Sequence, residues 1–190
     1  MLHPGNLGNR VVNGAGFTML GIALRTLLTI GSMAILARLL TPADFGYIAM
    51  ATTVTELAAL FGSFGFSNIL IQRKVINRLQ MDTLFWAGLL VGLVLTTVVF
   101  LLSFFAEWLF GDPITGDLLR VLCLSFLFGG LTAVHSAIIA RMMWFRLEFW
   151  IQIGVILCRS LVAIAFAYQG FGVWSLVAGA LAGVASSVLL

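Results

Sequence analysis

The fold of this chain is decided by residues 83–105, TLFWAGLLVGLVLTTVVFLLSFF, which contain no charged side chain. An α-helix rises about 1.5 Å per residue, so about 20 apolar residues cross the roughly 30 Å of hydrocarbon in a bilayer. The segment has that length and that composition. It therefore predicts a transmembrane helix.

Further apolar segments lie on both sides of this one. Of all residues, 62% are hydrophobic and only 9% are charged, and the mean hydropathy is +1.14, whereas soluble domains are roughly 45–50% apolar. Cutting the chain where charges, Pro and Gly cluster predicts spans at residues 16–39, 45–71, 83–105, 118–140, 149–168 and 173–190. The connections are short, so consecutive helices are expected to pack as antiparallel neighbours. The sequence thus predicts an all-α polytopic membrane protein, with an N-terminal tail at residues 1–15 and a six-helix transmembrane bundle at residues 16–190.

Basic residues indicate the orientation of these spans. Cytoplasmic loops of membrane proteins carry an excess of Lys and Arg. If the helices alternate in direction, one side of the membrane receives Arg10, Arg73, Lys74, Arg78, Arg141 and Arg146. The connections on the other side are mostly uncharged or acidic. We therefore expect a cytoplasmic N-terminal tail.

Three ionisable residues, Arg25, Glu56 and Arg159, lie well inside predicted spans. A charge at such a depth costs about 2.5–3.5 kcal/mol even on a lenient insertion scale, so it needs a partner or a water-filled cavity. Counting about 1.5 Å per residue from the cytoplasmic ends places all three at similar depths. Polar or small residues recur at helical spacing around Arg25 and Glu56, which is typical of a helix face turned toward protein or water.

Two arginines facing one glutamate leave a positive charge uncompensated, and a guanidinium binds phosphate through two parallel hydrogen bonds. We therefore predict a substrate cavity with Arg25, Arg159 and Glu56 as binding residues. The alternative is structural: Arg25 and Glu56 form an ion pair, and Arg159 extends toward the interface or bonds backbone carbonyls.

The sequence contains no catalytic motif: it has no Gly-rich phosphate loop with Lys, no Gly-x-Ser-x-Gly and no His-Glu-x-x-His. We interpret His135 as a hydrogen-bonded core histidine, with proton coupling as the alternative, and Cys123 and Cys158 as reduced core residues without metal-ligand spacing. We expect no enzyme activity, no cofactor and no metal. Scattered basic residues also lack the clustered face that nucleic-acid binding requires.

Particular strings resemble a known family. These are LARLLTPADFG at residues 36–46, FGFSNILIQRK at 64–74, the group His135, Ser136, Arg141, Phe145 and Arg146, and GFGVWSLV at 170–177. In this order they resemble signatures of Wzx-like polysaccharide flippases, within the multidrug/oligosaccharidyl-lipid/polysaccharide exporter superfamily. The first string also has a local interpretation, because Pro42 suits the start of a helix that Thr41 or Asp44 can cap.

The resemblance implies a bacterial inner-membrane protein that moves a polyprenyl-diphosphate-linked oligosaccharide to the periplasmic face, for lipopolysaccharide or exopolysaccharide synthesis. Its partners would be that lipid-linked oligosaccharide, membrane lipids, and a second lobe or the polysaccharide polymerase machinery. The family is implied to have two lobes and a cationic cavity between them. We therefore expect this chain, which stops inside an apolar run at Leu190, to be one lobe, truncated before the second.

Two other functions stay open. A drug or cation exporter of the same superfamily would favour acidic cavity residues, of which the spans offer only Glu56. A non-transporting membrane scaffold subunit would pair all three deep charges within a closed core. The feature that distinguishes these alternatives is an unpaired deep arginine.

Overall fold

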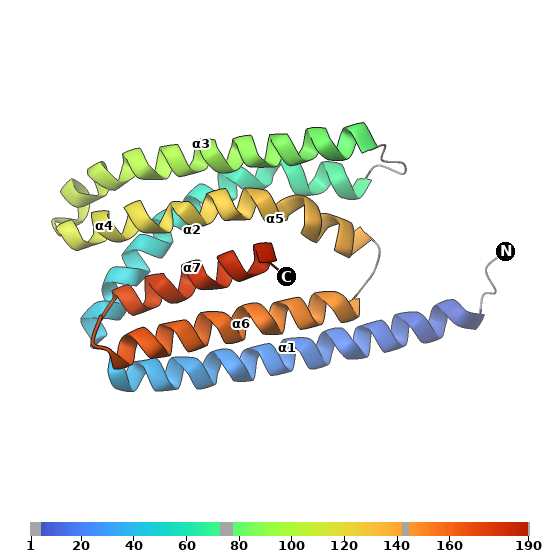
Figure 1. Ribbon diagram of the computed structural model, residues 1–190, viewed down its shortest axis with the longest axis horizontal. Helices are drawn as coiled ribbons and strands as arrows, with labels where there is room; N and C mark the ends of the chain where they lie inside the picture. The colour runs from blue at the N-terminus through green and yellow to red at the C-terminus, as the bar shows by residue number, and fades with distance from the viewer. Residues whose placement is uncertain (1–4, 73–77, 142–144, 190) are drawn as a thin grey trace.

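The computed structural model describes residues 5–72, 78–141 and 145–189, which form helices joined by short turns. Within these ranges the helices are α1 (Gly5–Leu39), α2 (Pro42–Gln72), α3 (Arg78–Phe110), α4 (Pro113–Leu122), α5 (Leu124–Arg141), α6 (Phe145–Tyr168) and α7 (Trp174–Leu189). They run up and down along one long axis (Figure 1). The prediction of an all-α polytopic membrane protein is confirmed.

The helix boundaries differ from the predicted spans at two places. Helix α1 begins at Gly5, so most of the segment predicted as a tail continues the first helix. The predicted fourth span consists of two successive helices, α4 and α5, with a break at Cys123. The hydroxyl of Thr96 on α3 donates a hydrogen bond of 3.1 Å to the carbonyl of Cys123. The same carbonyl also accepts from the Phe126 N–H at 3.1 Å, so the Thr96 bond ties the break to α3.

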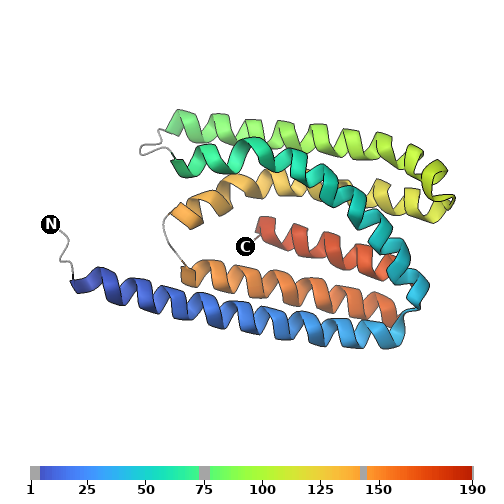
Figure 2. The same ribbon diagram turned by 180° about the vertical axis from the view of Figure 1, so that it is seen from behind.

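The expectation that consecutive helices are neighbours is wrong for α1 and α2. In the described part of the chain these two helices make almost no contact, and α1 packs along α6, which in turn packs along α7. Helices α2, α3, α4 and α5 form the rest of the bundle. Figures 1 and 2 show α1 and α2 diverging from the turn that joins them. The sides of α1 and α2 that face each other carry Arg25, Thr29 and Thr52. Burying these polar side chains between two helices, away from water, would cost free energy, so the two helices stay apart.

Apolar contacts follow the same division. One buried cluster joins α1 to α6 through Leu36, Leu40, Ala163 and Ala167. The other cluster joins α2, α3, α4 and α7, and its largest members include Val99, Leu118, Leu119, Leu122 and Val177. Because each cluster has its own set of helices, the space between them is where a cavity can form.

Three turns meet at one end of the bundle, which we call the turn end: Leu40 and Thr41 between α1 and α2, Gly111 and Asp112 between α3 and α4, and residues 169–173 between α6 and α7. Figure 2 shows these turns together at one end. The first turn is a reciprocal cap: the hydroxyl oxygen of Thr41 accepts from the Asp44 N–H at 3.4 Å, and the Asp44 carboxylate accepts from the Thr41 N–H and hydroxyl at 2.9 and 2.7 Å. The predicted capping of α2 is therefore confirmed.

The GFG string at residues 170–172 ends α6. Gly170 and Gly172 have φ of 82° and 55°, in the left-handed region that favours glycine. Phe171 N–H donates to the Phe166 carbonyl and Gly170 N–H to that of Ala167, which is the Schellman pattern. A Cβ on Gly172 would lie 3.3 Å from Asp44 Oδ1. Two of the strings behind the family resemblance thus touch at the turn end.

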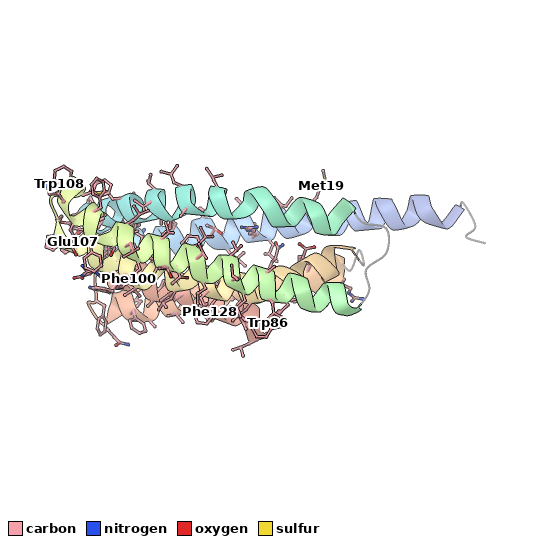
Figure 3. The ribbon with its side chains drawn as sticks, turned by 90° about the horizontal axis from the view of Figure 1, so that it is seen from above. Met19, Trp86, Phe100, Glu107, Trp108 and Phe128 are labelled. Atoms are coloured by element: carbon pink, nitrogen blue, oxygen red, sulfur yellow. The ribbon has the colours of Figure 1, made fainter. Side chains whose placement is uncertain are left out.

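The outer surface of the bundle is apolar. Among the described residues, four helical stretches are long and apolar enough to cross a membrane, namely Gly21–Leu39, Phe85–Trp108, Pro113–Thr132 and Arg146–Tyr168. Met19, Trp86 and Trp108 point away from the bundle in Figure 3, and each is more than half exposed. Continuous apolar surface of this kind belongs against lipid.

Candidate functional site: a cavity lined by two arginines

A cavity of about 330 Å³ lies between the two apolar clusters, near the fork where α1 and α2 separate. Its walls come from α1, α2, α4, α6 and α7. The residues that line it are Arg25, Thr29, Ser32, Met33, Leu36, Phe45, Ile48, Thr52, Leu122, Ile156, Arg159, Ser160, Ala163, Leu176 and Ala180. A substrate cavity that contains Arg25 and Arg159 was predicted from the sequence. In the structure, residues of α1, α2 and α6 line one cavity.

Both predicted arginines line this cavity. Arg25 comes from α1, one turn after Gly21, whose Cβ position lies 2.9 Å from the ring of Phe149 on α6. Arg159 comes from the middle of α6. Both arginine side chains are exposed to the cavity or its mouth rather than buried. Among the described lining residues there is no carboxylate, so the walls carry two positive charges.

The hydroxyl groups of the cavity are mostly committed to their own helices as donors. Thr29 donates to the Arg25 carbonyl at 2.8 Å, and Ser32 donates to the Thr29 carbonyl at 2.9 Å. Thr52 donates to the Ile48 carbonyl at 2.8 Å. Each hydroxyl therefore presents only its lone pairs to the cavity. The guanidinium groups are the main donors there, so they decide which ligand the cavity attracts.

Glu56 is not part of this cavity. It is exposed on α2, one turn beyond Thr52, and lines a separate depression with Thr53, Leu57, Ala59 and Leu60. Among the described residues, neither Arg25 nor Arg159 forms an ion pair, and neither does Glu56. The structural alternative, in which Arg25 pairs with Glu56, is therefore not what the structure contains. Whether Glu56 binds substrate stays a prediction.

The ion pairs of the described residues gather instead at the turn end, around Arg120. Its Nη2 lies 2.5 Å from Oε1 of Glu107, and its Nη1 lies 2.7 Å from Oδ1 of Asp117. Its guanidinium also lies over the ring of Phe104, 4.6 Å from the centroid. Figure 3 shows Glu107 at the same end as Trp108. The two Nη atoms of this arginine are paired with carboxylates, whereas its buried Nε has no hydrogen-bond partner among the described residues. The pair with Glu107 joins the end of α3 to α4.

Several cavity residues were missed by reasoning from sequence. Ile156, Ser160 and Ala163 share the cavity with Arg159, and Leu176 and Ala180 reach it from α7. Positions 156, 159, 160 and 163 follow helical spacing, so the face of α6 was available as a signal. The contribution of α7 was not, because its residues there are small and apolar like most of the chain. The side chain of His135 lies outside the described residues.

The cavity suits an anion. Two guanidinium groups without a neighbouring carboxylate, in a site walled by apolar helices, leave electrostatic attraction poorly screened. Guanidinium stays protonated and matches phosphate oxygens in a bidentate fork. Among the described residues, no three His, Cys, Asp or Glu side chains come together to hold a metal ion. The described walls of the cavity therefore offer positive charge and guanidinium donors to a ligand.

Comparisons with known proteins identify the family of the chain. The sequence profile of a family described as polysaccharide biosynthesis protein matches residues 35–190. The succinoglycan biosynthesis transport protein ExoT of Rhizobium meliloti (strain 1021) is 32% identical over 146 residues, which are 76% of this chain and 29% of that protein. The lipopolysaccharide biosynthesis protein WzxC of Escherichia coli (strain K12) is 30% identical over 121 residues, 64% of this chain and 25% of that protein.

A third relative, an uncharacterized membrane protein in the cps region of Klebsiella pneumoniae, is 31% identical over 87 residues, 44% of this chain and 18% of that protein. The chain thus spans less than a third of the length of the curated relatives it matches. No solved structure matches the chain significantly.

Proposed function

The chain belongs to the polysaccharide biosynthesis protein family of Wzx-like flippases, and from this premise we propose that it helps to flip a lipid-linked oligosaccharide across the bacterial inner membrane. The cargo in this proposal is a polyprenyl diphosphate that carries an oligosaccharide for surface polysaccharide. The chain would contribute one lobe of the transporter and would make or break no covalent bond. We propose that its N-terminus lies in the cytoplasm, as the basic residues of its loops favour.

The observation that carries the proposal is that Arg25 and Arg159 line one cavity and have no ion-pair partner among the residues that the structure describes. A diphosphate is the charged part of the proposed cargo and the part that a membrane interior repels most strongly. Two guanidinium groups facing it would replace the hydrogen bonds that it loses on leaving water. The hydroxyls of Thr29, Ser32 and Thr52 offer acceptors to the first sugar.

The alternatives receive less support. A drug or cation exporter would need negative charge where its ligand binds, and the described cavity walls carry only positive charge. A scaffold subunit would pair its deep charges, whereas the ion pairs among the described residues belong to Arg120 at the turn end. Neither alternative explains why Arg25 and Arg159 line the same cavity.

The test uses chromosomal variants of the complete protein in its own bacterium. Arg25→Ala and Arg159→Ala are expected to abolish or strongly reduce surface polysaccharide and to leave the lipid-linked precursor in the cytoplasmic leaflet. Membrane levels of the protein are measured in parallel. Arg38→Ala is the matched control, because Arg38 is an exposed arginine near the end of α1 that does not line the cavity. Unchanged polysaccharide in both cavity variants would contradict the proposal.

A further inference from the structure

We propose that Gly183 is a positioning residue for Arg159, because its missing side chain leaves a notch for the aliphatic stem of this arginine. The inference rests on the proposed function, in which Arg159 binds the phosphate group. Gly183 lies on α7 and is buried. Nothing in the chemistry of a glycine binds a phosphate, so its role would act through the arginine alone.

The contact involves the first three carbons of the arginine side chain. A Cβ on Gly183 would lie 3.1 Å from Cβ of Arg159 and 3.6 Å from both Cγ and Cδ. The Cβ atom of Arg159 is fixed to the backbone of α6 and cannot rotate away. A Cβ at position 183 would therefore move α6 from α7 by a few tenths of an ångström at the base of Arg159, while its contacts with Cγ and Cδ would be ordinary van der Waals contacts.

Neighbouring contacts hold the same stretch of α6 against α7. A Cβ on Gly179 would lie 2.7 Å from Cβ of Ala163 and 2.8 Å from the carbonyl oxygen of Arg159. The thiol of Cys158 lies 3.8 Å from the carbonyl of Ala182. The backbone of α7 thus covers the stem of Arg159, while the cavity that the arginine lines remains open. A long side chain held at its base loses less conformational entropy when it binds a ligand.

Two other close glycines in the bundle face the backbone of a neighbouring helix. A Cβ on Gly92 of α3 would lie 2.7 Å from the carbonyl of Phe126, and one on Gly130 of α5 would lie 2.6 Å from that of Gly88. These glycines let two backbones approach, which is helix packing. Gly183 instead faces the side chain of a cavity arginine. A substitution there should therefore change ligand binding and not stability alone.

The experiment is a double-mutant cycle on the full-length protein in lipid nanodiscs, with inorganic pyrophosphate as the probe and calorimetry as the measurement. Arg159→Ala is expected to weaken binding about tenfold or more. Gly183→Ala is expected to weaken it severalfold, and the double variant no further than Arg159→Ala alone. Thermal unfolding of the same proteins should respond additively, because the packing change persists without the guanidinium. Gly31→Ala is the control, since a Cβ there meets nothing within 4 Å.

The outcomes separate this inference from the proposed function. If Arg159→Ala weakens binding but Gly183→Ala does nothing, or adds its full effect in the Arg159→Ala background, the positioning role is overturned and the phosphate site stands. If Arg159→Ala leaves binding unchanged, both are overturned. If Gly183→Ala fails to enter the membrane, recovery by Arg159→Gly in the same chain supports the contact, and continued failure overturns it.

Discussion

Three arginines of this bundle sit in two contrasting surroundings. At the turn end, Arg120 is held by Glu107 and Asp117 and stacks over Phe104. In the cavity, Arg25 and Arg159 share walls of hydroxyl and apolar groups with no carboxylate among the described residues. The same side chain therefore has two surroundings: Arg120 joins two helices through its ion pairs, whereas no carboxylate among the described lining residues accompanies the two cavity arginines.

The two regions also differ in the number of side-chain hydrogen bonds and ion pairs that connect their elements. The turn end combines the reciprocal cap of Thr41 and Asp44, the Asp112 cap of α4 and the Arg120 cluster. The cavity lies where α1 and α2 separate and has few direct bonds across it.

The largest expected effect comes from reversing one cavity charge. Arg159→Glu would place a carboxylate opposite Arg25, cancel the positive charge of the walls and repel a phosphate group. We expect pyrophosphate affinity to fall about 100-fold or more, since one charged hydrogen-bonding partner is worth about 1.5–3 kcal/mol and repulsion adds to this. Calorimetry in nanodiscs measures it. If Arg159→Glu binds pyrophosphate as tightly as the unchanged protein does, Arg159 is not a ligand-binding arginine and does not differ from Arg120 in this respect.

The second effect is structural and belongs to the turn end. Arg120→Ala leaves Glu107 and Asp117 without their partner and removes the contact with Phe104, so we expect a loss of about 1–2 kcal/mol in stability. Thermal unfolding in detergent measures this, and pyrophosphate affinity should stay as in the unchanged protein. A weakened affinity with full stability would mean that Arg120 also serves the ligand.

A smaller loss is expected at the first turn of α2. Asp44→Ala removes the carboxylate that accepts from the Thr41 N–H and hydroxyl, and helix caps of this kind are worth about 1 kcal/mol. Asp44→Asn keeps an acceptor and should recover part of the stability. If both variants unfold at the same temperature as the original chain, the turn does not depend on this cap.

The smallest effect is expected for Glu56. Because its carboxylate lines a separate depression, Glu56→Gln should change pyrophosphate affinity less than about twofold, the difference expected of a screened charge outside the site. Gln152 is an exposed residue of α6 that does not line the cavity. The control substitution Gln152→Glu adds a charge there and should also leave the pyrophosphate affinity nearly unchanged. A large change for Glu56→Gln alone would return this residue to the binding site predicted from sequence.

Much of the fold followed from hydropathy, because a bilayer demands long apolar helices and the chain has them. The division of the predicted fourth span at Cys123 did not follow, since a tertiary bond from Thr96 supports the break. Nor did the separation of α1 from α2, because a short connection fixes that two helices are adjacent at one end and not along their lengths. The packing of α1 on α6 depends on Gly21 and Phe149, which are far apart in the sequence.

For the candidate site, the charged residues inside predicted spans were the only part of the sequence that indicated which residues to select. Arg25 and Arg159 were selected because a charge inside a span is costly, and the same reasoning selected Glu56. Depth along each helix could be counted, but the divergence of α2 from α1 could not. Glu56 lies one turn beyond Thr52, the last cavity residue of α2, and therefore outside the cavity of the arginines. The pairing of Arg120 was missed because Glu107 lies on another helix, 13 positions away in the sequence.

Our central proposal is that the cavity between α1, α2 and α6 is an anion site formed by Arg25 and Arg159, which have no ion-pair partner among the described residues. The most direct test is a calorimetric titration of the nanodisc-embedded protein with inorganic pyrophosphate, compared with the Arg25→Ala/Arg159→Ala double variant. The account predicts saturable binding that the double variant loses while its unfolding temperature is kept. Equal binding by both proteins would contradict it.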